Sequence, residues 1–228
     1  ATKGGRSRPA GAWALDARPE RLREACHDSL RRLGVDRLPL YQLHHPDPEV
    51  PFSDQVGALA RLRDEGKVEA VGLSNVSADR IREAQDLVPV ASVQNAFSPW
   101  TVDRRKSDVL RRCEEEGIPL LAYSPLGGRD RAADLVDSAG LQRVAASLAA
   151  TPQEVVLAWL LHRSPMLVPI PGATRPATAV SSARAGTVEL TSADADDVLQ
   201  ALRALPGRPG LLGRAARSVL HRLRSLLG

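Results

Sequence analysis

Short apolar runs alternate with longer amphipathic segments along this chain, and that alternation limits the fold more than any other feature. Each run is almost continuously apolar or β-branched, as is typical of parallel strands covered on both faces. Some of the longer segments carry helix signals, such as the capping box Thr151-Pro152-Gln153-Glu154. The predicted strands are Leu38–His44, Ala70–Leu73, Ala91–Ala96, Pro119–Tyr123 and Met166–Ile170. The predicted helices are Pro19–Leu33, Ser53–Glu65, Ala78–Leu87, Val102–Glu116, Ala132–Leu148, one from Thr151 to about Arg163 and one from Thr191 to Ala204.

Strands that alternate with helices predict βαβ units and a parallel sheet, which can be open or closed. With Ala1–Lys3 counted as the stub of a strand there are six strands, so an open doubly wound sheet and a barrel lacking two units both fit. No GxGxxG motif follows a strand and opens a helix, which removes the usual signature of an open dinucleotide-binding sheet. Polar groups follow most strand ends instead, where barrels gather their functional groups. The sequence therefore predicts an α/β fold of the TIM type, an incomplete (β/α)8 barrel.

The composition is that of an ordinary globular protein, with 43% hydrophobic and 25% charged residues. No apolar run approaches the roughly 18 residues that a membrane helix needs, and no signal peptide is expected. Cys26 and Cys113 are the only cysteines, and neither lies in a CxxC pair. Isolated thiols favour a reducing compartment, so the sequence predicts a cytoplasmic protein. We expect no metal site.

The net charge of +4 is concentrated in the last part of the chain. Five arginines and no Asp or Glu follow Leu205, so residues 1–205 are nearly neutral. A nucleic-acid site would need a basic stripe on the folded domain, and therefore none is expected. We predict a barrel domain over 1–205 and a basic amphipathic tail over 206–228, which docks on the barrel or on a partner chain rather than on a membrane.

Several short motifs occur in a fixed order near the predicted strand ends. Together they resemble the aldo-keto reductase family over residues 1 to about 190, and the resemblance implies an NADP-dependent barrel that transfers hydride from NADPH to a small aldehyde or ketone. Lys3 matches the lysine of the family's third strand, so the first two β/α units are predicted to be lacking. The motifs are Ser29-Leu30-Arg31-Arg32-Leu33-Gly34-Val35-Asp36, Leu40-Tyr41-Gln42-Leu43-His44-His45-Pro46, Glu65-Gly66-Lys67-Val68, Val71-Gly72-Leu73-Ser74-Asn75, Gln94, Tyr123-Ser124-Pro125-Leu126-Gly127 and Pro169-Ile170-Pro171-Gly172-Ala173.

The resemblance assigns catalytic roles to Lys3 and His44. In the family the lysine lowers the pKa of a neighbouring tyrosine, so that the phenol can protonate the carbonyl oxygen. His44 aligns with the catalytic histidine, whose neutral imidazole can donate a hydrogen bond to the carbonyl. Adjacent strand residues face opposite ways, so we expect His44 to face the barrel and His45 to shape the pocket rim. A solvated lysine and a core histidine are the structural alternatives.

The resemblance also predicts a cofactor site at the strand ends. Ser74, Asn75 and Gln94 would bind the nicotinamide carboxamide, because an amide offers both a donor and an acceptor. The ring of Tyr123 would stack on the nicotinamide. The alternative for each residue is a cap at a strand end.

Two glycine-containing loops lie where barrels usually bind phosphate. The first supplies Ser124, Leu126 and Gly127, and the second supplies Gly172, Ala173, Thr174 and Arg175. A helix that begins near Thr174 would direct N–H groups at an anion, and Arg175 could pair with the 2′-phosphate of NADP. The chain departs from its relatives at Ser181-Ser182, where a Glu-Asn pair is common.

Trp13 and Trp100 follow strand ends and are predicted to line the substrate pocket with His45, whereas Trp159 is predicted to be core. The family's catalytic Asp and Tyr precede the lysine, and no residue of this sequence can match them. A truncated reductase and a degenerate paralogue both fit. A non-catalytic nucleotide-binding module and a barrel enzyme that uses Lys3 as a Schiff-base nucleophile remain alternatives. An unclosed barrel exposes two edges, through which the chain could pair with another copy.

Overall fold

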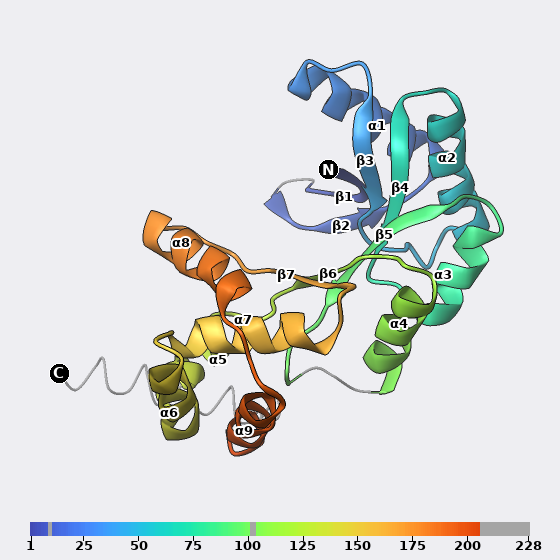
Figure 1. The fold of residues 1–228 in the computed structure, drawn as a ribbon. Coiled ribbons are helices and arrows are strands. Elements are labelled where there is room, and N and C mark those ends of the chain that lie inside the picture. Colours follow the sequence, from blue (N-terminus) through green and yellow to red (C-terminus); the bar gives the residue numbers. More distant parts are fainter. Residues whose placement is uncertain (9–10, 101–103, 206–228) are drawn as a thin grey trace, which may run out of the picture.

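The computed structural model describes residues 1–8, 11–100 and 104–205 (Figure 1). A seven-stranded sheet forms its centre, in the order β2-β1-β3-β4-β5-β6-β7. Neighbouring strands are parallel from β1 and β3 through β7, and only β2 runs antiparallel to its neighbour β1. The strands are β1 (Thr2–Ser7), β2 (Ala14–Asp16), β3 (Leu38–Leu43), β4 (Val68–Ser74), β5 (Val90–Ala96), β6 (Leu120–Tyr123) and β7 (Leu167–Ile170).

Helices connect successive parallel strands, as βαβ units require. Ser77 caps α3, and Thr151 forms the predicted capping box of α7 with Glu154. The helices are α1 (Pro19–Leu33), α2 (Phe52–Asp64), α3 (Ala78–Gln85), α4 (Arg104–Glu115), α5 (Arg129–Val136), α6 (Ala139–Ser147), α7 (Pro152–Arg163), α8 (Pro176–Arg184) and α9 (Ser192–Arg203), with a short 3-10 turn at Ala185–Thr187.

Three predictions of secondary structure were wrong. The first strand does not end at Lys3 but continues to Ser7. The strand β2 was not predicted, because three residues carry no periodic signal and depend on pairing with β1. The single helix expected over Ala132–Leu148 is divided into α5 and α6, because Ser138 leaves the helical conformation and caps α6 by accepting from the Leu141 N–H. The predicted start of α4 at Val102 and the predicted tail 206–228 lie outside the described residues.

The outer face of the sheet holds the main core. Leu43, Leu73 and Val93 are fully buried beneath the helices, as alternation along each strand requires. Tyr41 is also fully buried, and its hydroxyl donates to the Leu22 carbonyl of α1 at 2.9 Å. A Cβ at Gly4 would lie 2.1 Å from that hydroxyl, so glycine is required for β1 to approach the ring.

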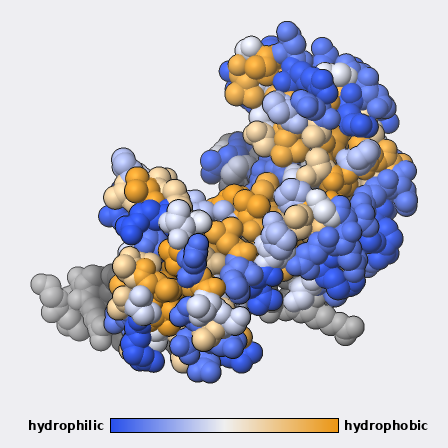
Figure 2. Space-filling model, viewed as in Figure 1, coloured by the Kyte–Doolittle hydropathy of each residue, from blue (hydrophilic) through white to orange (hydrophobic). Residues whose placement is uncertain are grey.

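The inner face of the sheet faces an open hollow because the barrel is incomplete. Figure 2 shows a hollow between α8 and the upper strands, with apolar residues along its floor. The edge strand β7 leaves Val168 and Ile170 39% and 38% exposed, which is unusual for the inner face of a barrel strand. The predicted incomplete TIM-type barrel is confirmed. Its open edges are β2 and β7.

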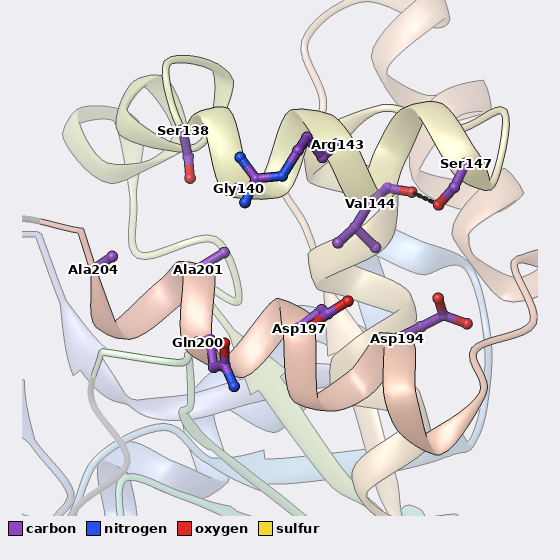
Figure 3. A pocket seen from close by; sticks show the side chains of 10 residues that line it. All are labelled: Ser138, Gly140, Arg143, Val144, Ser147, Asp194, Asp197, Gln200, Ala201 and Ala204. Atoms are coloured by element: carbon purple, nitrogen blue, oxygen red, sulfur yellow. Dashed lines mark hydrogen bonds between the residues drawn. The ribbon is translucent and has the colours of Figure 1, made fainter.

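The last helices pack on one another beside the barrel. Gly140 lets α6 approach α9 closely, because a Cβ there would lie 2.7 Å from the Ala201 Cβ. A cleft of about 440 Å³ runs between these two helices, away from the carboxyl ends of the strands (Figure 3). It is lined by Ser138, Gly140, Arg143, Val144, Ser147, Asp194, Asp197, Gln200, Ala201 and Ala204. Among the described residues no single helix is long and apolar enough to cross a membrane; α6 and α7 pass a length and composition test only as a pair bent by 79°.

Candidate active site at the carboxyl ends of the strands

The parallel register brings the predicted site residues of four strands to one end of the sheet. His44 directly follows β3, Ser74 ends β4 and pairs with Gln94 of β5, and Tyr123 ends β6. Lys3 lies further from this end of the sheet, where it pairs with Gln42 of β3. Because the carboxyl ends of parallel strands meet at one edge, separations of tens of residues in sequence become neighbouring positions in space.

Asn75 links three of these strand ends through its side-chain amide. Its Nδ2 donates to the His44 carbonyl at 2.9 Å and to Ser74 Oγ at 3.1 Å. Its Oδ1 accepts from the Tyr123 hydroxyl at 2.7 Å. Both amide hydrogens of Asn75 are therefore used within the protein. The Gln94 side chain, which is 9% exposed, has no hydrogen-bond partner among the described residues.

Two residues of the site adopt a backbone conformation that side chains other than glycine rarely take. Asn75 has φ of 61° directly after β4, and Ser124 has φ of 51° directly after β6. Asparagine tolerates the left-handed region better than most residues, whereas serine there carries more strain. Strained residues concentrate at functional sites, because the surrounding structure must hold them in place.

His44 is held as a neutral imidazole. Partial burial, together with the positive charges of Lys3 and Arg6, lowers its pKa to about 4. Burial also lowers the pKa of the Lys3 ammonium. The backbone N–H of His44 donates to the Gly4 carbonyl at 2.8 Å, which fixes the residue between β1 and β3. Near neutral pH, His44 can therefore donate a hydrogen bond without carrying charge.

The neighbouring histidine has a different environment. The Nδ1 of His45 lies 2.9 Å from the Pro46 carbonyl oxygen, which orients its ring along the loop that leaves β3. The Trp13 ring meets the His44 ring edge-on, with centroids 6.2 Å apart. Trp13 is 55% exposed, so solvent reaches its ring next to His44.

Three polar clusters that support this site were missed by the sequence analysis. Gln55, fully buried on α2, accepts from the Asp47 N–H at 3.0 Å and donates to the carbonyls of Asp47 and Val50 at 2.8 and 2.7 Å. Asp47 in turn accepts from the Glu49 N–H at 3.0 Å and the Ala17 N–H at 3.2 Å. An Asp after a proline is a turn signal that could have indicated this loop, but its partner on α2 could not be read from the sequence.

The second cluster pins the loop after β4. Asn95 Oδ1 accepts from the Val76 N–H at 3.1 Å, and Asn95 Nδ2 donates to the Val76 carbonyl at 2.7 Å. The third lies inside the barrel, where Gln42 Nε2 donates to Ser92 Oγ at 3.1 Å. This bond crosses the strand between them, and only a glycine at position 72 leaves room, because a Cβ there would lie 2.5 Å from Ser92 Oγ.

The first predicted phosphate loop packs against an aromatic ring. Gly127 has φ of 74°, and a Cβ there would lie 2.7 Å from the Trp100 ring. The Arg131 guanidinium lies over the same ring, with its Cζ 5.5 Å from the centroid. Trp100 thus supports the loop after β6, and its indole Nε1 is buried without a partner among the described residues. Leu126 packs against the core from the same loop.

The second predicted phosphate loop stands apart from the strand-end cluster. Gly172, Ala173, Thr174 and Arg175 are all exposed, and α8 begins at Pro176, two residues later than expected. None of the residues from 171 to 180 forms a side-chain hydrogen bond to the rest of the described chain. Arg175 is the N-cap of α8, so this exposed arginine is at the helix N-terminus, whose first backbone N–H groups an anion could use.

The remaining titratable groups offer little further chemistry. Cys26 and Cys113 are free and buried, and burial raises their thiol pKa values to about 11 and about 12, which makes them poor nucleophiles. No group of three or more His, Cys, Asp or Glu residues in the described parts of the chain could hold a metal ion. Trp159 is core as predicted, 5% exposed, with its Nε1 donating to the Ala195 carbonyl at 3.1 Å.

Comparison with known proteins matches this arrangement to one family. The profile described as "Aldo/keto reductase family" matches residues 1–203. An uncharacterised oxidoreductase of Schizosaccharomyces pombe is 37% identical over 84% of this chain and 61% of its own length. A probable aldo-keto reductase of Glycine max is 33% identical over 82% of this chain and 62% of its own length. The chain therefore spans about three-fifths of the length of these curated relatives.

A solved structure agrees with the sequence comparisons. The aldose reductase of Giardia lamblia superposes with a TM-score of 0.70 at 26% identity, covering 84% of this chain and 70% of that one.

Proposed function

The chain belongs to the aldo/keto reductase family, and we propose that, with its barrel complete, it reduces a small aldehyde or ketone to the alcohol with NADPH. The observation that carries the proposal is that His44, with its neutral imidazole, and the Asn75–Tyr123 pair lie together at the carboxyl ends of β3, β4 and β6, where the Asn75 amide donates to the His44 backbone carbonyl. A cytoplasmic location is proposed with it, supported by the two unpaired, buried thiols.

The residues of this chain fit a nicotinamide cofactor, with one exception. The Gln94 amide is free to pair with a carboxamide, and the exposed Arg175 at the start of α8 suits a phosphate. Asn75 already uses both amide hydrogens on protein oxygens, so it would have to release one of them to bind the cofactor. When bound, the cofactor supplies a hydride to the carbonyl carbon. We propose NADPH over NADH because Arg175 offers a guanidinium for the 2′-phosphate.

The protein's own groups would orient and polarise the carbonyl. His44, neutral at physiological pH, would donate a hydrogen bond to the carbonyl oxygen and fix its direction. Lys3, whose pKa is lowered by burial, would hold positive charge next to the catalytic tyrosine that the complete barrel would supply as the proton donor. Tyr123 would offer its ring face to the cofactor while its hydroxyl remains on Asn75.

A restoration experiment tests the proposal. We expect a polypeptide of these 228 residues to reduce aldehydes about 10²–10⁴-fold more slowly than the same chain extended at its start by the first two β/α units of a relative, because one general acid contributes about that factor. The measurement is the loss of NADPH absorbance with a panel of aldehydes and quinones. Replacement of the added segment's catalytic tyrosine by phenylalanine should return the rate to the slow level.

The alternatives predict different results. NADPH binding without turnover in the extended chain would favour a non-catalytic nucleotide-binding module. Equal rates for the two chains would show that a residue of this sequence, Tyr123 first, supplies the proton.

A further inference from the structure

Two arginines stack on the exposed tryptophan beside His44. The Cζ of Arg8 lies 4.4 Å from the Trp13 ring centroid, and the Cζ of Arg6 lies 5.4 Å from it. Arg6 and Arg8 are exposed, and Trp13 is 55% exposed. Stacking orders the two guanidinium groups without neutralising their charge. One exposed ring therefore gathers two positive charges.

These charges lie beside the group proposed to bind the substrate carbonyl. The Trp13 ring meets the His44 ring edge-on at 6.2 Å between centroids, with an 82° angle between the planes. Gly5 adopts φ of 95°, which interrupts the regular alternation of side chains between the two faces of β1. This interruption falls between Lys3 and Arg6. The positive charges of both Lys3 and Arg6 reach His44. Lys3 and Arg6 thus place positive charge near His44, and Arg8 adds a third positive charge on the Trp13 ring beside it.

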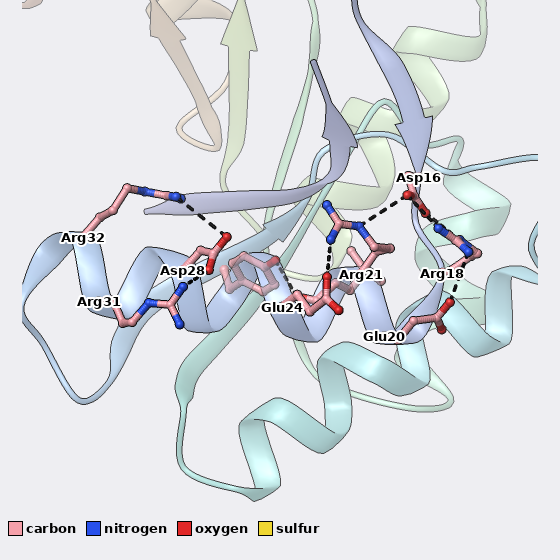
Figure 4. Close-up of polar contacts among 10 residues, drawn as sticks. Asp16, Arg18, Glu20, Arg21, Glu24, Asp28, Arg31 and Arg32 are labelled. Atoms are coloured by element: carbon pink, nitrogen blue, oxygen red, sulfur yellow. Dashed lines mark hydrogen bonds and ion pairs between the residues drawn. The ribbon is translucent and has the colours of Figure 1, made fainter. Parts of the chain in front are cut away.

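No carboxylate of the described chain neutralises this cluster. Lys3, Arg6 and Arg8 take part in none of the ion pairs among the described residues, whereas all four arginines of α1 do. The acidic residue of β2, Asp16, is occupied by Arg18 at 2.8 Å and Arg21 at 3.4 Å (Figure 4). A cleft lined by charge of one sign concentrates ligands of the opposite sign.

We propose that Arg6 and Arg8 form an anion subsite, and that the preferred substrate is an aldehyde or ketone that carries a carboxylate or phosphate group. The assignment rests on the proposed function for its carbonyl chemistry. Guanidinium forks bind carboxylate and phosphate oxygens in pairs, and the Trp13 ring provides an apolar wall for the carbon skeleton between the anion and the carbonyl. The anionic end then directs the carbonyl toward His44.

Matched substrates test the subsite. The kcat/KM of the 228-residue chain is measured with 4-carboxybenzaldehyde and with 4-formylbenzamide, its uncharged counterpart of nearly the same shape. A third substrate, 4-formylphenyl phosphate, distinguishes a preference for phosphate from one for carboxylate. We expect the acid to be preferred over the amide by about tenfold or more, and Arg6→Gln/Arg8→Gln to remove that preference, because a charged hydrogen bond contributes about this factor. Arg63→Gln removes one exposed positive charge from the last turn of α2, and it should leave the ratio of kcat/KM for the acid to that for the amide unchanged.

A binding measurement separates this inference from the proposed function. Calorimetric titration compares 4-(hydroxymethyl)benzoate with 4-(hydroxymethyl)benzamide, with and without NADP⁺, in the wild-type chain and the double variant. If the chain extended by the first two β/α units reduces no aldehyde, the proposed function fails, and tighter binding of the benzoate that is lost in the double variant still supports the subsite. Two results would overturn the subsite. One is equal kcat/KM and equal affinity for the acid and the amide in the wild-type chain, and the other is a preference for the acid that survives in the double variant.

Discussion

The loops after β3 and β4 differ sharply from the loop that joins β7 to α8, although the family resemblance assigns all three to one active site. Side chains pin the first two loops: Gln55 holds the loop after His45, and Asn95 holds both backbone groups of Val76. In the third loop, residues 172–175 are exposed and their side chains bond to nothing else in the described chain.

This difference indicates that the loops have different roles in the site. Groups that must meet a carbonyl within a fraction of an ångström need a rigid support of packing and hydrogen bonds. A loop that binds the phosphate end of a long ligand can remain open until the ligand arrives. We therefore expect substitutions in the pinned loops to change catalysis and stability, and substitutions in the α8 loop to change ligand affinity alone.

Removal of the His44 imidazole should have the largest effect. In the chain extended by the first two β/α units of a relative, we expect His44→Ala to lower kcat/KM by about 10²-fold or more, as for a lost acid–base or orienting group. His45→Ala should mainly change the choice among aldehydes, because its ring is oriented toward Pro46. If the two phenotypes are exchanged, His45 and not His44 faces the substrate.

The α8 loop is tested through Arg175. Its change to alanine should weaken NADPH binding by about 1.5–3 kcal/mol, the range for a charged hydrogen bond, with little change for NADH. Fluorescence titration with both cofactors measures this difference. Arg184→Ala, at the other end of α8, is the matched control and should leave the affinities for NADPH and NADH unchanged. Equal losses for NADPH and NADH would place Arg175 away from the 2′-phosphate.

The pinned loop after β3 is tested through Gln55. Gln55→Leu leaves the Asp47 N–H and two carbonyls without their partners, and we expect the free energy of unfolding to fall by about 1–3 kcal/mol. Gln85→Leu removes an exposed bond to Glu116 and should change it by no more than about 0.5 kcal/mol. Urea denaturation measures both. If Gln55→Leu and Gln85→Leu lower the free energy of unfolding by similarly small amounts, the loop after β3 is held no more firmly than the protein surface.

The last expected effect is a pH dependence of stability. The pKa of folded His44 is about 4, below the value of about 6.5 for an unfolded histidine. The unfolded chain therefore binds more protons between these values, and the free energy of unfolding falls as the pH is lowered through that window. His44→Gln should make this decline shallower. Identical slopes for wild type and His44→Gln in urea denaturation would contradict the neutral, partly buried imidazole.

Much of the fold could be predicted because its signals are local. Continuous apolar runs gave the strands β3 to β7 to within about two residues, and the caps at Thr151 and Thr191 located α7 and α9. The failures occurred where a neighbour decides the outcome. β2 exists only by pairing with β1, and the break between α5 and α6 depends on the capping geometry of Ser138.

For the candidate site, the sequence determined which residues are present and in which order along the chain, and ordered motifs were enough to indicate the family. The tertiary structure decided which of them meet. Parallel register joined His44, Asn75 and Tyr123, and a hairpin brought Arg6 and Arg8 onto Trp13 beside His44. Long-range hydrogen bonds and electrostatic fields depend on distances through space, and the sequence by itself specifies only distances along the chain.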